Sequence, residues 1–131
     1  MKIIKLQKGD RIVATLEEKL AQMKIDSGFL WGIGAISSAE LMAYKLDSKK
    51  YLSKKISGTY ETLSFMATIT KGIDRDVMIH PHIVLADENF NCLGGHLKEG
   101  IVAATLEIAI LSSEQKLERY YDKKIGLNLI K

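Results

Sequence analysis

The three histidines of this chain all fall within seventeen residues, at positions 80, 82 and 96. His80 and His82 lie inside an apolar run, residues 77–85, and His96 follows two glycines. Because successive side chains of a strand point to opposite faces, His80 and His82 are expected to point the same way. A glycine-rich turn is expected to bring His96 back to them. Three converging neutral imidazoles form a site for a transition metal such as zinc, with the fourth position open as in catalytic zinc sites.

A second interpretation of the same histidines remains open, in which they pack and hydrogen-bond at an interface between subunits. In the metal interpretation, water or a donor from a neighbouring chain fills the fourth position. Cys92, the only cysteine, stands four residues before His96. It is expected to be a small buried apolar side chain rather than a ligand.

Two glutamates stand inside otherwise apolar, strand-like runs, where an unpaired carboxylate is costly. Glu61 and Glu107 are therefore candidates for a general base or for a partner that orients a histidine. The alternative is a structural salt bridge or a position facing solvent. Three glycines bracket His96: Gly94 and Gly95 are expected to supply positive φ in a tight turn, and Gly100 lies on the other side.

Composition bounds the class of protein. The chain has 131 residues, 47% of them hydrophobic, which predicts one globular domain over residues 1–131. No apolar run approaches the roughly 20 residues needed to cross a membrane, and the N-terminus does not resemble a signal peptide. A single cysteine excludes an internal disulfide and fits a cytoplasmic location. Dinucleotide-binding, P-loop, serine-nucleophile and Cys-x-x-Cys motifs are absent from the sequence.

The net charge is +3, and the positive charge is concentrated in the first half of the chain. Residues 1–60 hold 11 basic and 6 acidic side chains, a balance of +5, whereas residues 61–131 hold 8 and 10, a balance of −2. A lysine-rich hairpin carries most of the excess and is a candidate for contacts with DNA phosphates. The alternative is a solvated hairpin whose lysines keep a sheet edge soluble. The five lysines are Lys45, Lys49, Lys50, Lys54 and Lys55.

Hydrophobic periodicity predicts an α+β fold with an antiparallel-dominated sheet and one main amphipathic helix. The helix is expected to span roughly 15 residues, with Asp10 as its N-cap and Ser27-Gly28 at its end. Residues 112–124 are expected to be irregular or helical, and Trp31 is expected in the core. So much apolar strand surface suggests a second copy of the chain as a partner. Strands are expected over residues 2–6, 29–46 (as one strand or two joined at Gly32 and Gly34), 49–55, 59–70, 77–85, 101–111 and 126–130.

Several motifs, in order along the chain, resemble the plants-and-prokaryotes conserved (PPC) domain. They are Gly34-Ala35-Ile36, Ser57-Gly58-Thr59-Tyr60-Glu61, His80-Pro81-His82, Gly94-Gly95-His96-Leu97-Lys98-Glu99-Gly100 and Thr105-Leu106-Glu107-Ile108. The domain has a predicted DNA-binding role, and in plants it follows AT-hooks in the AT-hook nuclear-localised proteins. This chain has no Arg-Gly-Arg core and resembles the stand-alone prokaryotic members.

The resemblance implies an α+β fold assembled as a homotrimer, with a histidine cluster shared among prokaryotic members. Two hypotheses follow. In the first, the protein is a DNA-associated trimer that carries a three-histidine metal site. In the second, it is a zinc-dependent enzyme or a small-ligand-binding protein that acts at His80, His82 and His96.

Overall fold

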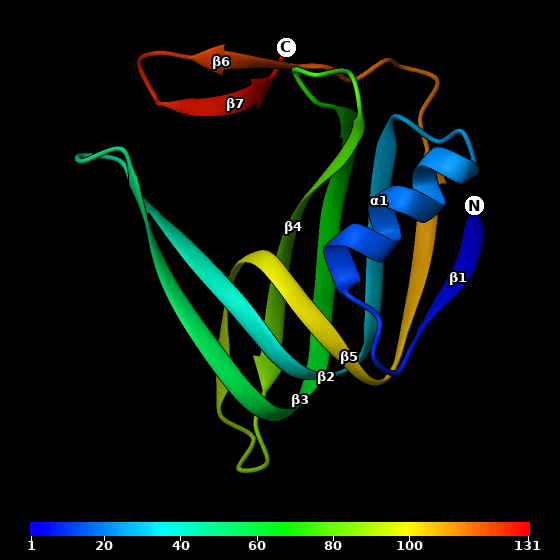
Figure 1. Cartoon of the computed structure of the whole chain (residues 1–131), viewed down its shortest axis with the longest axis vertical. Helices are drawn as coiled ribbons and strands as arrows, with labels where there is room; N and C mark the ends of the chain where they lie inside the picture. Colours follow the sequence, from blue (N-terminus) through cyan, green and yellow to red (C-terminus); the bar gives the residue numbers. More distant parts are fainter.

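The computed structural model describes residues 1–131 as a strongly curved antiparallel sheet with one short helix and a small C-terminal hairpin (Figure 1). The mostly antiparallel sheet with one helix fits the α+β class. No helix of the protein is long and apolar enough to cross a membrane. The elements are β1 (Lys2–Gln7), α1 (Ile12–Gln22), β2 (Gly28–Lys45), β3 (Lys50–Lys71), β4 (Val77–Ala86), β5 (Cys92–Ser112), β6 (Arg119–Asp122) and β7 (Leu127–Ile130).

The main sheet has the strand order β1-β5-β2-β3-β4, and the first residues of β5 pair a second time, with β4. The strands β2, β3, β4 and β5 therefore form a closed ring at one end of the sheet. At the other end β5 leaves β4 and pairs with β1, so residues 77–81 of β4 have a neighbouring strand on one side only. Pro81, which has no N–H to donate, is therefore at an edge of the sheet, where a strand tolerates proline.

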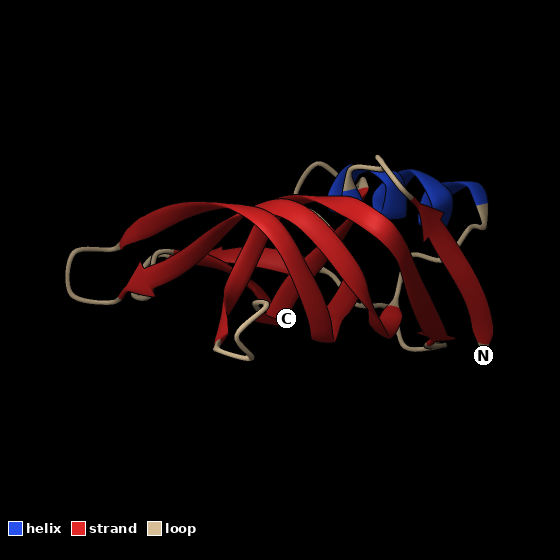
Figure 2. Ribbon diagram, turned by 90° about the horizontal axis from the view of Figure 1, so that it is seen from below, coloured by secondary structure: helices blue, strands red, loops and turns tan.

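The helix α1 covers the gap between β4 and β5, and it lies against one face of the curved sheet (Figure 2). Two carboxylates fix it there. Glu17 accepts a hydrogen bond from the Ile79 amide of β4 at 3.1 Å. Glu99 of β5 accepts hydrogen bonds from the amides of Val13 and Ala14, in the first turn of α1, at 2.8 and 3.2 Å. Helix and sheet therefore share hydrogen bonds as well as apolar contacts.

The hydrophobic core lies between α1 and the sheet. Ile12, Leu16 and Leu20 are fully buried and recur at the helical spacing of four, which confirms the amphipathic pattern. They pack among alternate residues of the strands, such as Leu30 of β2 and Phe65 of β3. The opposite face of the sheet is not covered by any element of this chain except the β6–β7 hairpin.

The helix differs from its prediction at both ends. It has 11 residues instead of roughly 15, and Arg11 occupies the N-cap position without a side-chain hydrogen bond. Asp10 does not cap it, because its carboxylate accepts a hydrogen bond from the Gln7 amide within the preceding turn. The helix ends before Ser27-Gly28 because Lys24 adopts a positive φ of 58°, which terminates α-helical geometry.

The strands β3 and β5 are longer than the sequence pattern predicts. The segment 29–46 forms one strand, with register shifts between Gly32 and Gly34 and between Ile36 and Ser38. The two predicted strands at 49–55 and 59–70 are one strand, β3, because the pairing with β2 continues through Gly58. No helix forms in residues 112–124: residues 113–118 form a loop, and Arg119–Asp122 form the strand β6. Trp31 is 41% exposed on the outer face, so its predicted core position is wrong.

Candidate metal centre

The three histidines converge, and the sheet register is the reason. His80 and His82 lie on one face of β4, two residues apart, as the strand period requires. His96 of β5 is the direct cross-strand partner of His82, and on its other side it pairs with Met42 of β2. Directly paired residues of an antiparallel sheet present their side chains on the same face. The place where β5 pairs with two strands therefore brings the third imidazole to the first two.

The distances within the cluster suit a single ion. The ligand-capable nitrogens of His80, His82 and His96 all lie within 4.8 Å of one another. The Nε2 atoms of His80 and His82 are 3.3 Å apart. Two nitrogens bound to one tetrahedral zinc, each at about 2.0–2.1 Å, lie about 3.3 Å from each other. The ring centroids are separated by 5.0 to 5.5 Å.

The electrostatic environment favours the neutral form of two imidazoles in this cluster. Burial, followed by the neighbouring His96, Arg119 and His82, lowers the pKa of His80 to about 4. The pKa of His96 is lowered by burial first, then by His82 and Arg119. A neutral imidazole has a free nitrogen lone pair, which is the form that binds a metal.

The carboxylates expected near the histidines lie elsewhere. Glu61 is exposed on β3 and pairs with Ala86, four residues along β4 from His82. Glu107 is exposed on β5 and pairs with Lys5 and Ile33. The carboxylate of neither glutamate makes a hydrogen bond or ion pair within the chain, so neither carboxylate orients a histidine.

Cys92 begins β5 and is exposed, which corrects the expectation that it is a buried apolar residue. Its sulfur lies 3.9 Å from the backbone oxygen of Phe90, and it does not join the histidine cluster.

The glycines before His96 act differently from the prediction. Gly94 and Gly95 lie within β5 and neither has a positive φ, so the tight turn is absent; the reversal between β4 and β5 occurs at residues 87–91. Glycines are needed at these two positions because the backbone of β5 lies close to the backbones of β4 and β2 there. A Cβ at Gly94 would collide with the carbonyl oxygen of Ile83, and one at Gly95 would lie 3.0 Å from the Met42 carbonyl oxygen. Gly100 is likewise inside β5, packed near Ile12.

The five predicted DNA-contact lysines are exposed, but the hairpin of β2 and β3 divides them. The pairing of Lys45 with Lys50 and of Leu41 with Lys54 places Lys45, Lys50 and Lys54 on one face. Lys55, paired with Glu40, lies on the opposite face. Lys49 stands in the connecting turn, where its ammonium donates to the Lys123 carbonyl at 2.9 Å. The hairpin therefore presents three neighbouring lysines rather than five.

The roles of two residues, Glu99 and Arg119, were not predicted from the sequence. Glu99, inside the Gly94–Gly100 motif, bonds to the start of α1. Arg119 of β6 lies near His80 and His96, and these three residues line one cavity. Val13 lies 86 positions from Glu99 and Thr70 lies 49 positions from Arg119, so no local pattern signals either role.

Comparison with known proteins identifies the family. The family model of the Plants and Prokaryotes Conserved (PCC) domain matches residues 1–114. The chain belongs to this family. The match covers the whole main sheet, α1 and all three histidines, and it ends before the β6–β7 hairpin. No curated protein matches the sequence.

Three solved structures are similar over nearly the whole chain. A candidate DNA-binding protein from Bacteroides thetaiotaomicron is 26% identical, with a TM-score of 0.93 over 98% of this chain and 90% of its own. A candidate DNA-binding protein from Ralstonia eutropha is 27% identical, with a TM-score of 0.89 over 98% and 89%. A metal-containing protein from Archaeoglobus fulgidus is 28% identical, with a TM-score of 0.91 over 98% and 91%.

Proposed function

We propose that this PCC-family protein binds one divalent transition metal, zinc being the simplest choice, through His80, His82 and His96. The observation that carries the proposal is the convergence of three imidazoles whose nitrogens lie within 4.8 Å of one another. The similar Archaeoglobus protein, named for its metal content, supports it. A zinc ion held by three histidines keeps a position for water or substrate, where it polarises a carbonyl or lowers the pKa of bound water.

The test is the metal content of untagged protein, measured by mass spectrometry, in the wild type and in three variants. We expect close to one zinc per chain in the wild type, and loss of zinc in His82→Ala and His96→Ala. Losing a group that merely orients a ligand costs about 10–100-fold in metal affinity, so losing a ligand should cost more. Cys92→Ala is the matched control, because it removes a thiol from the same strand outside the cluster.

Zinc retained after both histidine substitutions, or lost with Cys92→Ala, would refute the assignment. His82 is exposed, so its replacement should leave the fold intact, and circular dichroism checks this. If the wild-type protein contains no metal and His82→Ala leaves the fold unchanged, the result would favour the alternative in which the histidines pack and hydrogen-bond at an interface between subunits.

We further propose that the protein assembles as a homotrimer through the outer face of the sheet. A cross-strand row on this face joins Ile3, Ala109, Trp31, Met66 and His82. Ile3, Trp31 and Met66 are 67%, 41% and 47% exposed, so the row is an apolar surface that ends at the histidine cluster. Contiguous apolar surface of this kind is typical of interfaces.

The trimer is tested by light scattering coupled to gel filtration. We expect the wild type at three times the chain mass of 14.6 kDa, and Trp31→Glu at a lower mass because a buried charge destabilises the interface. Leu46→Glu, exposed in the β2–β3 turn away from this row, is the control. A monomeric wild type, or a Trp31→Glu variant that stays trimeric, would contradict the proposed interface.

DNA association is a second candidate, favoured by the shared face of Lys45, Lys50 and Lys54 and by the similar proteins named for DNA binding. Because phosphate contacts release counterions, neutralising these three lysines should reduce the slope of log K against log salt by about 2.7, at roughly 0.9 per contact. Fluorescence anisotropy with duplex DNA measures this slope. Lys2→Gln, on the distant strand β1, is the control. An unchanged slope in the triple variant would refute the lysine contact surface.

A further inference from the structure

A cavity of about 620 Å³ adjoins the histidine cluster. His80 and His96 form part of one wall, and the β6–β7 hairpin forms another with Leu127, Leu129 and Ile130. The volume lies in the range typical of pockets for small organic ligands, about 300–1,000 Å³. The hairpin lies beyond residues 1–114, the part matched by the family model, so this wall is contributed by a separate segment of the chain.

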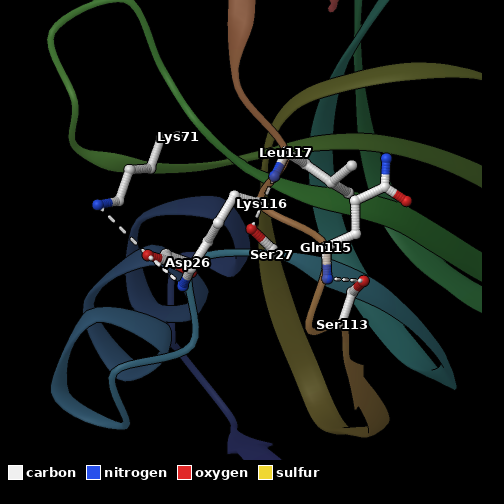
Figure 3. A network of polar contacts seen from close by, with 7 residues as sticks. All are labelled: Asp26, Ser27, Lys71, Ser113, Gln115, Lys116 and Leu117. Carbon is white, nitrogen blue, oxygen red and sulfur yellow. Dashed lines mark hydrogen bonds and ion pairs between the residues drawn. The ribbon is translucent and has the colours of Figure 1, made fainter.

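The hairpin is held in place at both ends. Just before β6, Asp26 pairs with Lys116 and Lys71 at 3.1 and 3.3 Å, and Ser27 accepts a hydrogen bond from the Leu117 amide (Figure 3). At its turn, the Ile125 carbonyl accepts a hydrogen bond from the Tyr44 hydroxyl at 2.7 Å. The cavity is therefore formed before any ligand arrives, which reduces the entropy cost of binding.

The distinctive group in the cavity wall is Arg119. Only 9% of the residue is exposed, and no carboxylate lies within ion-pair distance of its guanidinium. Its Nε donates to Thr70, one Nη to the Asn128 carbonyl and the other Nη to Thr68, at 3.0, 2.7 and 3.1 Å.

These three hydrogen bonds leave the charge of Arg119 uncompensated. A guanidinium has five N–H groups, so one N–H on each terminal nitrogen has no partner within the chain. All three acceptors are neutral. A buried cation without a counter-charge is costly, and an anion in the cavity would compensate it.

We propose that this cavity binds a small organic carboxylate, whose anionic group contacts Arg119 and whose apolar body lies against the β6–β7 hairpin. A carboxylate matches the planar guanidinium and carries the single charge that one arginine neutralises. A phosphate dianion would leave one charge uncompensated, because no second cationic residue lines the cavity. The inference goes beyond the proposed metal centre and does not rest on it, since neither the contact with Arg119 nor the contact with the hairpin involves a metal.

The test is isothermal titration calorimetry of the metal-free full-length protein, after the chelator has been removed by gel filtration. The probes are 3-phenylpropionate, the straight-chain acids from butyrate to octanoate, and the neutral primary amide of each acid. We expect saturable binding of at least one acid, and binding of the matching amide at least tenfold weaker. No binding of any acid, or equal binding of acid and amide, would overturn the proposal.

Variants locate the site. Arg119→Gln should weaken acid binding at least tenfold, whereas Arg75→Gln, which removes the same charge from the exposed β3–β4 turn, should not. Because Arg119→Gln also removes contacts of the hairpin, Leu129→Trp serves as a second variant that fills the cavity and keeps the arginine. Unchanged binding in either Arg119→Gln or Leu129→Trp would overturn the proposal.

Repeating the titration with stoichiometric zinc separates the two proposals. Acid binding that persists without zinc supports the cavity even where the metal assignment fails. If the wild type binds zinc, His82→Ala loses it, and no acid binds to the wild type, the cavity proposal is overturned and the metal proposal stands.

Discussion

Replacing Glu99 by glutamine should destabilise the protein by about 2 kcal/mol. The carboxylate accepts amide hydrogen bonds from Val13 and Gly100 on one oxygen and from Ala14 on the other, and it lies 3.8 Å from the Arg11 guanidinium. Glutamine keeps one acceptor oxygen but presents an NH₂ group where the other oxygen stood. The lost charge-assisted hydrogen bond is worth about 1.5–3 kcal/mol, and the lost negative charge at the helix N-terminus about 0.3–1 kcal/mol. The exposed ion pair with Arg11 adds little.

The assay is thermal unfolding followed by circular dichroism. A chain of 131 residues has an unfolding entropy of roughly 0.28 kcal/mol/K, so a loss of about 2 kcal/mol should lower the Tm by about 7 °C. Glu107→Gln is the matched control, because Glu107 is exposed on the same strand and makes no hydrogen bond or ion pair; its effect should stay within about 0.5 kcal/mol. A Tm for Glu99→Gln within 2 °C of the wild type, on the order of the control's own effect, would refute the capping role.

Three other predictions concern the sheet, the ion pairs of Asp26 with Lys116 and Lys71, and the metal. Gly94→Ala should lower stability by about 1–3 kcal/mol in urea unfolding, because its Cβ meets the Ile83 carbonyl oxygen, and unchanged stability would contradict the close approach. The hydrogen bond from Lys116 lowers the pKa of Asp26, so this carboxylate stabilises the fold above its unfolded pKa and loses that effect as pH falls through its folded pKa. Asp26→Asn should therefore remove about 0.2–1 kcal/mol at pH 7 and progressively less as the pH falls through the folded pKa of Asp26, and a loss that does not change with pH would contradict the ion pair. Zinc at 100 times its Kd should stabilise the wild type by about 2.7 kcal/mol, seen as a higher Tm, and should not stabilise His82→Ala; equal stabilisation of both would contradict the site.

Local periodicity predicted the elements of this fold where one face is buried. The spacing of Ile12, Leu16 and Leu20 predicted α1, and the alternation around His80 and His82 predicted that the two imidazoles share a face. The ends of the elements were predicted less well because tertiary contacts set them. The cap of α1 comes from Glu99, a residue 86 positions away from Val13, and so no pattern near the helix reveals it.

The convergence of His96 on the other histidines was expected, but for a different reason from the one the structure shows. A tight turn was predicted from Gly94 and Gly95, whereas both lie in extended backbone within β5. Glycine signals both positive φ and close backbone approach, and the sequence alone does not distinguish them. Only the register, which pairs His96 with His82 and Met42, shows that close approach is the requirement.

The same register connects the stability of the sheet to the candidate metal centre. The first residues of β5 close the ring by pairing with β4 on one side and β2 on the other, and His96 stands at the junction. An ion bound by His80, His82 and His96 would join β4 to β5 where the two strands begin to separate toward α1. Binding energy at this point therefore opposes opening of the ring, since a ligand that binds only the closed state stabilises it by mass action. A substitution that loosens the junction, such as Gly94→Ala, should for the same reason weaken metal binding without touching a ligand.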